Sequence, residues 1–323
     1  ALAIIQLSFN LLKYFFQYLV IHKKYTFLKL NRANCRRSML KQIYHYSIYS
    51  FIISIALKLL FYTDSVVIGS LLTVSKITFY AIPATLMQYM EKFIYAAISV
   101  LTPVISSYDA VGEGTKNRNI YILGSRYALT LSIPVLFVLY TNGTSFISLW
   151  MGPEYGQKCS TVLKILIIGY IFAFPQMIAN GILKGTSRHK VFAYILIVEA
   201  IANLAISIIL VRAYDIEGVA FGTTLPLIIT NFILVPLYTC KTLGLRYGTY
   251  LWRSYATPSV LLVLLGSLYY VRPIETSSYT ELIVYSACIT FVVAVFSLTY
   301  IFDKAHRNWL LGNLKKFLLS PWA

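Results

Sequence analysis

Long apolar runs, separated by short polar connections, follow one another along the whole chain. Each run has about 20 residues, the length that an α-helix needs to cross a hydrocarbon core of about 30 Å. Strands of an outer-membrane barrel would instead alternate apolar and polar residues over about ten positions. The pattern therefore predicts an all-α polytopic membrane protein with about nine transmembrane helices. Their expected positions are 1–20, 43–71, 78–102, 119–140, 161–183, 191–211, 218–239, 255–271 and 282–302.

Polar and charged residues recur within several of these runs, on one face of the expected helix. In 78–102 they follow one another at steps of three or four, and 43–71 has a similar pattern. An ionised side chain at the bilayer centre costs about 2.5–3.5 kcal/mol on insertion scales, so several of them imply a hydrated interior or tightly paired partners. We expect a water-filled cavity between helices. The candidate cavity residues are Lys58, Gln88, Glu91, Lys92, Tyr95, Arg126, Gln176, Asn180 and Asn203.

The acids Asp64 and Glu199 are the strongest individual candidates for a buried polar site. Lysine and arginine side chains can extend their charged ends to the membrane surface, as those of Lys58 and Arg126 could, whereas an acid does so poorly. A neighbouring pair such as Glu91 and Lys92 could instead satisfy partners on adjacent helices. For each residue taken singly, a purely structural role therefore stays open.

Composition supports the same class, because 58% of the residues are hydrophobic and only 12% are charged, against roughly 25% charged in soluble proteins. Five connections together hold 20 of the Lys and Arg residues, namely 21–42, 105–126, 184–190, 240–253 and 303–323. The connections between them hold one each: Lys76, Lys158, Arg212 and Arg272. The positive-inside rule then predicts an outside N-terminus and a cytoplasmic C-terminus. The net charge of +17 faces anionic lipid on this interpretation, and it does not indicate nucleic-acid binding.

Motifs of nucleotide hydrolysis and metal catalysis are missing from the sequence. It contains no GxxxxGK[ST] loop, no HExxH and no paired-cysteine zinc motif. The four histidines and four cysteines are widely spaced, so neither a metal site nor a disulfide framework is expected. The connections leave no room for a soluble catalytic domain. We therefore expect a protein that is not an enzyme and uses no cofactor, and we interpret the N-x-T sequon at Asn142 as a chance occurrence.

A series of short motifs between about residues 45 and 250 resembles the oligosaccharide flippases of the multidrug/oligosaccharidyl-lipid/polysaccharide exporter superfamily. These are the Wzx-type polysaccharide biosynthesis proteins, which translocate O-antigen and capsule repeat units. The matching motifs, in order, are Thr63-Asp64 with Ile68-Gly69, Tyr80 with Ile82-Pro83, Leu101, Pro103 and Ser106 with Gly112-Glu113, FISLWMGPE at 146–154, ILKGTSRHK at 182–190, EAIANLAIS at 199–207 and GVAFGTTLP at 218–226. Each motif alone is weak, but their order matches the C-terminal lobe of this superfamily.

The resemblance implies a MATE-like transporter fold of two six-helix lobes with two additional helices. On that basis residues 1–42 are the last helix of the N-terminal lobe and a basic cytoplasmic loop, and 43–239 are the C-terminal lobe. Residues 240–302 are the two additional helices, and 303–323 form a cytoplasmic amphipathic tail. The first run has no charged segment before it, so a signal peptide is not expected, and the odd number of spans favours a piece of a longer, N-terminally truncated protein.

The resemblance also implies a cargo and a mechanism. Family members move undecaprenyl-diphosphate-linked oligosaccharide units from the cytoplasmic to the outer leaflet of the bacterial inner membrane by alternating access, in pathways such as lipopolysaccharide assembly. Cations such as Lys58, Lys92 and Arg126 could attract the diphosphate. Asp64 and Glu199 are candidate ion- or proton-coupling residues, because a carboxyl group in low-dielectric surroundings can exchange a proton. Expected partners are the lipid-linked substrate, the bilayer, and the glycan polymerase and glycosyltransferases of the same pathway.

Three alternatives stay open. A drug/cation antiporter or a peptidoglycan-precursor flippase would share the fold, because one architecture hosts several cargoes. A polytopic membrane enzyme of glycan assembly would be expected to carry a large outer loop with catalytic charges, which this sequence lacks. A purely structural membrane subunit would leave the polar helix faces unexplained.

Overall fold

The computed structural model describes residues 2–25, 37–271, 274, 276–303, 307–308 and 312. All regular elements among these residues are helices, and they form two units, Ala1–Ile48 and Tyr49–Ala323. The central part of the predicted basic loop, 26–36, lies outside the described residues. So does most of the predicted amphipathic tail at 303–323.

The first unit contains α1 (Leu2–Lys24) and the part of α2 (Arg37–Leu71) that ends at Ile48. Helix α1 exposes large apolar side chains around its circumference, among them Phe9, Leu11 and Phe15. A helix that is apolar on all sides is suited to contact with lipid. The three residues at its end, His22, Lys23 and Lys24, are basic.

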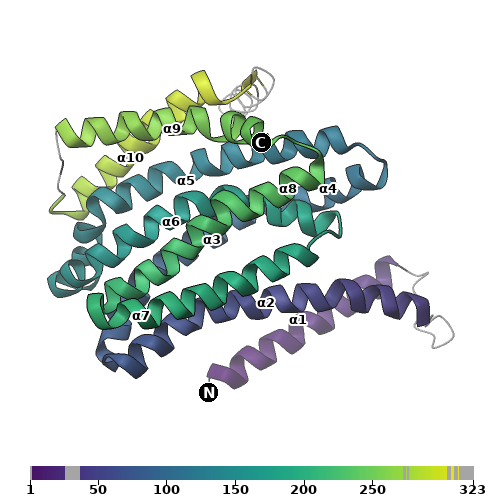
Figure 1. Ribbon diagram of the computed structural model, residues 1–323, viewed down its shortest axis with the longest axis horizontal. Coiled ribbons are helices and arrows are strands. Elements are labelled where there is room, and N and C mark those ends of the chain that lie inside the picture. Colours follow the sequence, from purple (N-terminus) through teal and green to yellow (C-terminus); the bar gives the residue numbers. More distant parts are fainter. Residues whose placement is uncertain are drawn as a thin grey trace. The chain divides into compact units, whose positions relative to one another are not determined.

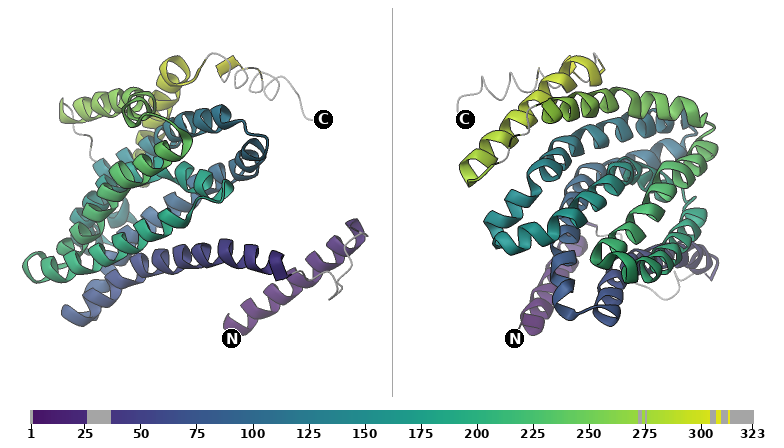
Figure 2. Two further views of the ribbon diagram at one scale, coloured as in Figure 1. Left: turned by 45° about the vertical axis from the view of Figure 1, so that its right-hand side comes forward. Right: turned by 60° about the vertical axis from the view of Figure 1, so that its left-hand side comes forward.

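The second unit is a bundle whose helices run alongside one another (Figure 1). Helix α6 is central and packs against α3, α5 and α7, while α9 and α10 both pack against α5 (Figure 2). After the end of α2, the elements are α3 (Val74–Ser99), α4 (Leu101–Ala110), α5 (Gly114–Met151), α6 (Pro153–Gly185), α7 (Lys190–Ile228), the π-helix η2 (Ile229–Leu234), α8 (Val235–Leu243), α9 (Tyr247–Val271), α10 (Tyr279–Phe296) and the π-helix η3 (Ser297–Ile301).

Among the described residues, 7 helical stretches are long and apolar enough to cross a membrane, or 8 when α3 and α4, which meet at a bend of 42°, count as one span. The longest stretch, Lys190–Leu243, has 54 residues and contains non-helical backbone at Tyr214 and Asp215. Hydrogen bonds join residues on both sides of this break, so the chain reverses direction there. Counted as two spans, this stretch brings the total to about nine. The predicted all-α polytopic class is confirmed.

Two glycines allow the halves of α7 to approach closely after the reversal. A Cβ atom at Gly218 would lie 2.3 Å from the carbonyl oxygen of Leu210. A Cβ atom at Gly222 would lie 2.1 Å from the hydroxyl oxygen of Ser207. Both distances are far below van der Waals contact, so the packing of this hairpin depends on the missing side chains.

Helix α5 extends beyond the predicted span 119–140 and reaches Met151, with one non-helical residue at Asn142. The outer connection expected at 141–160 is therefore mostly helical, and the turn itself is made by Gly152 at a φ of 109°. Asn142 is 1% exposed, and its Oδ1 accepts hydrogen bonds from the backbone N–H and the hydroxyl of Thr276, both at 3.1 Å. The asparagine of the sequon thus fixes the α9–α10 connection.

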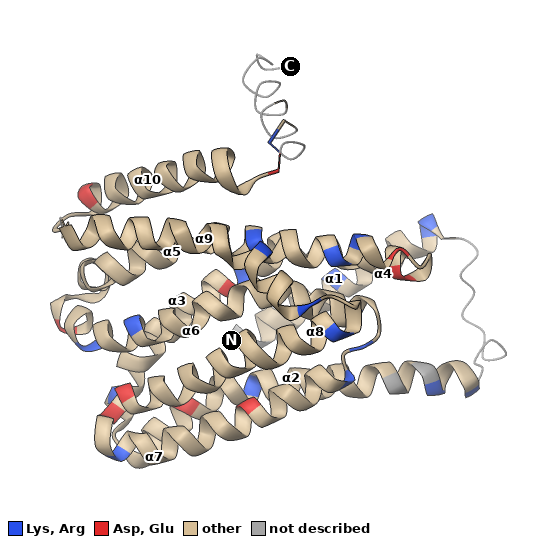
Figure 3. Cartoon of the chain, turned by 45° about the horizontal axis from the view of Figure 1, so that its top comes forward, with Lys and Arg blue, Asp and Glu red and all other residues tan. Residues whose placement is uncertain are grey.

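Charged residues are sparse along the helices and gather near their ends (Figure 3). In the second unit, Lys and Arg are most frequent at the end of the bundle where α4 and α8 lie (Figure 3). A few acids interrupt the uncharged stretches of the helices. Three of them, Asp64, Glu91 and Glu199, line a cavity of the second unit.

Candidate functional site

A cavity of about 450 Å³ lies within the second unit, between α2, α3, α6 and α7. Its apolar lining includes Leu57, Ala84 and Phe192. Most of the residues that the sequence predicted for a cavity line this one, together with polar residues that it did not predict. The polar lining residues are Asp64, Tyr80, Gln88, Glu91, Lys92, Tyr95, Tyr170, Gln176, Asn180, Glu199, Thr223 and Asn231.

Helix α3 supplies a continuous polar face to the cavity. Gln88, Glu91 and Tyr95 follow at steps of three and four, which places them along one side of the helix. Met87 and Ile94 lie on the side turned away and are fully buried in the core. The amphipathic pattern that predicted a cavity thus separates the cavity face of α3 from its packing face.

Asp64 is 4% exposed and belongs to a buried hydrogen-bond network. The hydroxyl of Tyr80 donates to its Oδ2 at 2.5 Å, and the hydroxyl of Thr223 donates to the same oxygen at 3.0 Å. The side-chain N–H of Asn203 donates to Thr223 Oγ1 at 2.9 Å. Oδ1 of Asp64 and Oδ1 of Asn203 are also buried, and neither accepts a hydrogen bond from any residue that the structure describes.

The Asp64 carboxylate also has no positively charged partner within the described ranges, where the four ion pairs all join other residues. A buried carboxylate without a cation is strongly disfavoured in an apolar environment, so binding a proton or a cation at this group would relieve a large desolvation penalty. The two buried oxygens on Asp64 and Asn203 are of the type that hard cations prefer as ligands. Within the described residues, no cluster of three or more His, Cys, Asp or Glu is placed to hold a metal ion.

Glu199 is the second buried acid, at 3% exposed. The hydroxyl of Thr230 donates to its Oε2 at 2.7 Å. Thr230 belongs to η2, which follows Pro226 and whose π-helical turns change the direction of the side chains. The next residue, Asn231, lines the cavity. The sequence analysis missed Thr230 and Asn231, although the pair T-N in an otherwise apolar span after a proline was a usable signal.

Gln176 lines the cavity, and both polar atoms of its amide already make hydrogen bonds. Tyr121 donates to its Oε1 at 2.9 Å, and its Nε2 donates to Tyr250 at 2.8 Å and Tyr255 at 3.0 Å. The rings of Tyr121 and Tyr250 stack with centroids 4.2 Å apart. Gln176 therefore ties α5, α6 and α9 together, and nothing in its sequence surroundings identified these three tyrosines as its partners.

Three predicted residues lie outside the cavity lining. Asn203 is buried behind Thr223, as part of the Asp64 network. Lys58 is exposed on α2, and its contact with a cargo stays a prediction. Arg126 donates to the backbone carbonyl of Arg253 at 2.7 Å, so it ties α5 to α9, and its role toward a cargo also stays a prediction.

A protein family described as polysaccharide biosynthesis protein matches residues 1–160 of this chain. Among curated proteins, Agl15 of Haloferax volcanii, described as a probable low-salt glycan biosynthesis flippase, is 22% identical over 207 residues. The chain is similar to membrane proteins of polysaccharide biosynthesis. The aligned part is 64% of this chain and 43% of the relative, so the chain matches less than half the length of this curated protein.

Proposed function

We propose that the protein containing this chain moves a lipid-linked glycan across a membrane by alternating access. The observation that carries the proposal is a cavity inside the membrane-spanning bundle that is lined by acids, amides and tyrosines. Such a lining is costly in lipid unless the interior is hydrated or binds a polar molecule. The similarity to a glycan biosynthesis flippase supports a glycan as that molecule.

The cargo we propose is an oligosaccharide joined to an isoprenoid lipid through a diphosphate, as in O-antigen repeat units carried on undecaprenyl diphosphate. Its sugars need hydrogen-bonding groups in the membrane, and Gln88, Asn180 and Asn231 offer amides in the cavity. Its phosphates need cations, and Lys92 lines the cavity next to the ring of Tyr89, with its ammonium 5.4 Å from the ring centroid. Lys58 and Arg126 are proposed as further attractive charges along the route.

The driving force we propose is exchange of an ion or proton at Asp64, with Glu199 as a second candidate. Both acids line the cavity, and both are almost fully buried. An occupant that neutralises Asp64 removes a large desolvation penalty, so binding and release can be coupled to a change in conformation. The unpartnered oxygens on Asp64 and Asn203 support this assignment.

The membrane is proposed to be the bacterial inner membrane, as the resemblance implies. The C-terminus is proposed to be in the cytoplasm on the basis of the distribution of Lys and Arg. We further propose that the 1–42, 43–239, 240–302 and 303–323 segments have the roles expected from the resemblance. Glycosyltransferases would then supply the cargo and a glycan polymerase would consume it, while this protein performs transport and no catalysis.

The test is complementation in cells that lack the natural protein. The unmodified protein is expected to restore lipid-linked glycan on the outer face, measured by lectin binding to intact cells. Asp64→Asn is expected to reduce the restored signal on the order of tenfold, with Glu199→Gln having a smaller effect. Asp109→Asn is the matched control, because Asp109 is an exposed acid outside the cavity.

Normal glycan export in cells that lack the protein would contradict the flippase proposal. Full export by the Asp64→Asn variant would contradict only the coupling role of Asp64. A changed resistance to cationic drugs with unchanged glycan export would favour the antiporter alternative instead.

A further inference from the structure

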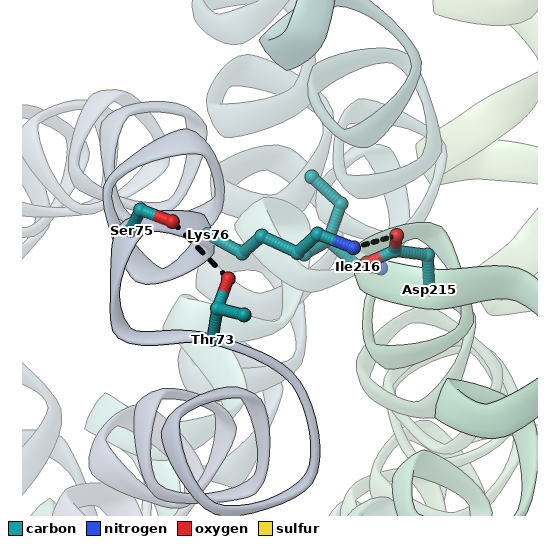
Figure 4. A network of polar contacts seen from close by, with 5 residues as sticks. All are labelled: Thr73, Ser75, Lys76, Asp215 and Ile216. Atoms are coloured by element: carbon teal, nitrogen blue, oxygen red, sulfur yellow. Dashed lines mark hydrogen bonds and ion pairs between the residues drawn. The ribbon is translucent and has the colours of Figure 1, made fainter.

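An ion pair between Lys76 and Asp215 joins the beginning of α3 to the reversal in α7 (Figure 4). The two side chains are 36% and 47% exposed, so the pair is accessible to solvent. Asp215 has a φ of 55°, a region that non-glycine residues rarely adopt. Its Oδ1 accepts a hydrogen bond from the backbone N–H of Ile216 at 2.7 Å, which fixes the turn that presents the carboxylate to Lys76 (Figure 4).

The same two helical elements meet again deeper in the bundle. Tyr80 lies one helical turn after Lys76, and Thr223 lies about two turns after Asp215. The hydroxyl groups of Tyr80 and Thr223 are 3.0 Å apart. One line of polar contacts therefore runs along the boundary between α3 and the α7 hairpin, from the exposed ion pair to the Asp64 network.

The ion pair lies beyond the end of the cavity. Asp64, Tyr80 and Thr223 line the cavity, whereas Lys76 and Asp215 do not. The two residues of the pair belong to connections that the positive-inside rule predicts to be on the outer side. A contact between α3 and α7 at this position closes the boundary through which an occupant of the cavity would leave.

The Lys76–Asp215 ion pair and the Tyr80–Asp64 hydrogen bond differ in strength. An exposed ion pair contributes little to stability, so it can open and close readily. The hydrogen bond from Tyr80 to Asp64 is short and buried, and such a bond is roughly twice as strong while its acceptor is charged. The inner contact is thus the one that responds to an ion or proton on Asp64.

We infer that the Lys76–Asp215 pair is the outer closure of the cavity, and that Tyr80 is the positioning residue that links this closure to the state of Asp64. This inference rests on the proposed function for the coupling role of Asp64. Tyr80 of α3 and Thr223 of the α7 hairpin both bond to the same oxygen of Asp64, so this carboxylate of α2 holds α3 against the α7 hairpin and the outer pair is closed. Loss of the Tyr80–Asp64 bond releases the beginning of α3 and opens the cavity outward.

The test measures access to the cavity from outside the cell, so it does not depend on the cargo. A reporter cysteine is introduced as Ala84→Cys, a lining position one turn after Tyr80, in a protein whose own cysteines are replaced. The rate of reaction with a membrane-impermeant maleimide is expected to rise roughly fivefold in Lys76→Ala, Asp215→Asn and Tyr80→Phe. Asp215→Asn keeps an oxygen for the Ile216 N–H, so the turn itself is retained.

Two further variants make the inference specific. Lys76→Arg keeps a cation for Asp215 and is expected to retain the slow rate. As a single change, Asp64→Asn is expected to raise the rate. In the Tyr80→Phe background it is expected to add nothing, because both changes act on the same hydrogen bond. Lys116→Ala is the matched control, since Lys116 makes an exposed ion pair with Glu113, three residues before it, and neither residue belongs to α3 or α7.

An unchanged rate in Lys76→Ala and Asp215→Asn would overturn the closure. Additive effects of Asp64→Asn and Tyr80→Phe would overturn the link through Tyr80. Either result could occur while glycan export depends on Asp64, so failure of this inference is distinguishable from failure of the proposed function. The labelling rates could also follow the prediction while cells that lack the protein still export glycan normally. That combination would contradict the proposed function and leave the closure inference intact.

Discussion

Asp64 and Gln176 both line the cavity, but their polar atoms are used differently. Asp64 keeps one buried oxygen without a partner among the described residues, whereas each polar atom of Gln176 is engaged by a tyrosine. An unpartnered oxygen beside a cavity is available to a ligand, and a fully engaged amide stabilises the fold instead. Lining a cavity is therefore not sufficient to assign a residue to a ligand site.

We expect Gln176→Leu to destabilise the protein by about 2–4 kcal/mol, because it removes the hydrogen bonds of Tyr121, Tyr250 and Tyr255 to the amide. The measurement is thermal unfolding in detergent, followed by the reaction of a thiol dye with Cys159 and Cys240, which are free and buried. Gln88→Leu is the control, because Gln88 lines the cavity and makes no hydrogen bond to the described part of the chain. A similar melting temperature for both variants would contradict this division of roles.

The α7 hairpin is the element that assembles the site. It brings Glu199 and Asn203 of one half beside Thr230 and Thr223 of the other. The reversal at Asp215 and the close approach at Gly218 and Gly222 set the register between the halves. Because the contacts repeat along the hairpin, a change at one glycine is expected to displace the whole polar network.

We expect Gly218→Ala and Gly222→Ala to destabilise the protein by about 1–3 kcal/mol, since each added methyl group overlaps the facing half of the hairpin. Gly266→Ala is the matched control in α9, where an added Cβ atom would meet nothing within 4 Å. That substitution is expected to be neutral or stabilising by about 0.5–1 kcal/mol. Thermal unfolding of the three variants checks the prediction, and equal melting temperatures would show that the close approach is unimportant.

At the scale of the whole molecule, the sequence predicted the membrane class, the approximate spans and most of the polar cavity residues. Periodicity reveals which face of a helix is polar, as for Gln88, Glu91 and Tyr95, because those residues share one helix. It does not reveal partners on other helices. The tyrosines around Gln176, the Tyr80–Asp64 bond and the Lys76–Asp215 pair all join residues that are distant in sequence.

Two further residues show that the sequence pattern does not reveal contacts with other helices. Asn142 resembles a loop residue, yet it lies inside α5, where its side chain bonds to Thr276. Arg126 resembles a cavity cation, yet it bonds to the backbone of α9. In both cases the side chain makes a long-range contact, and such contacts have no local sequence signal.

The central claim is that the natural protein transports a lipid-linked glycan by using the Asp64 cavity. The most direct measurement is transbilayer movement of a polyprenyl-diphosphate-linked oligosaccharide in proteoliposomes, read by lectin access to the outer leaflet under a sodium or proton gradient. The account predicts gradient-dependent movement that is much faster than in protein-free liposomes and falls on the order of tenfold in Asp64→Asn. Movement no faster than without protein, or identical in Asp64→Asn, would contradict it.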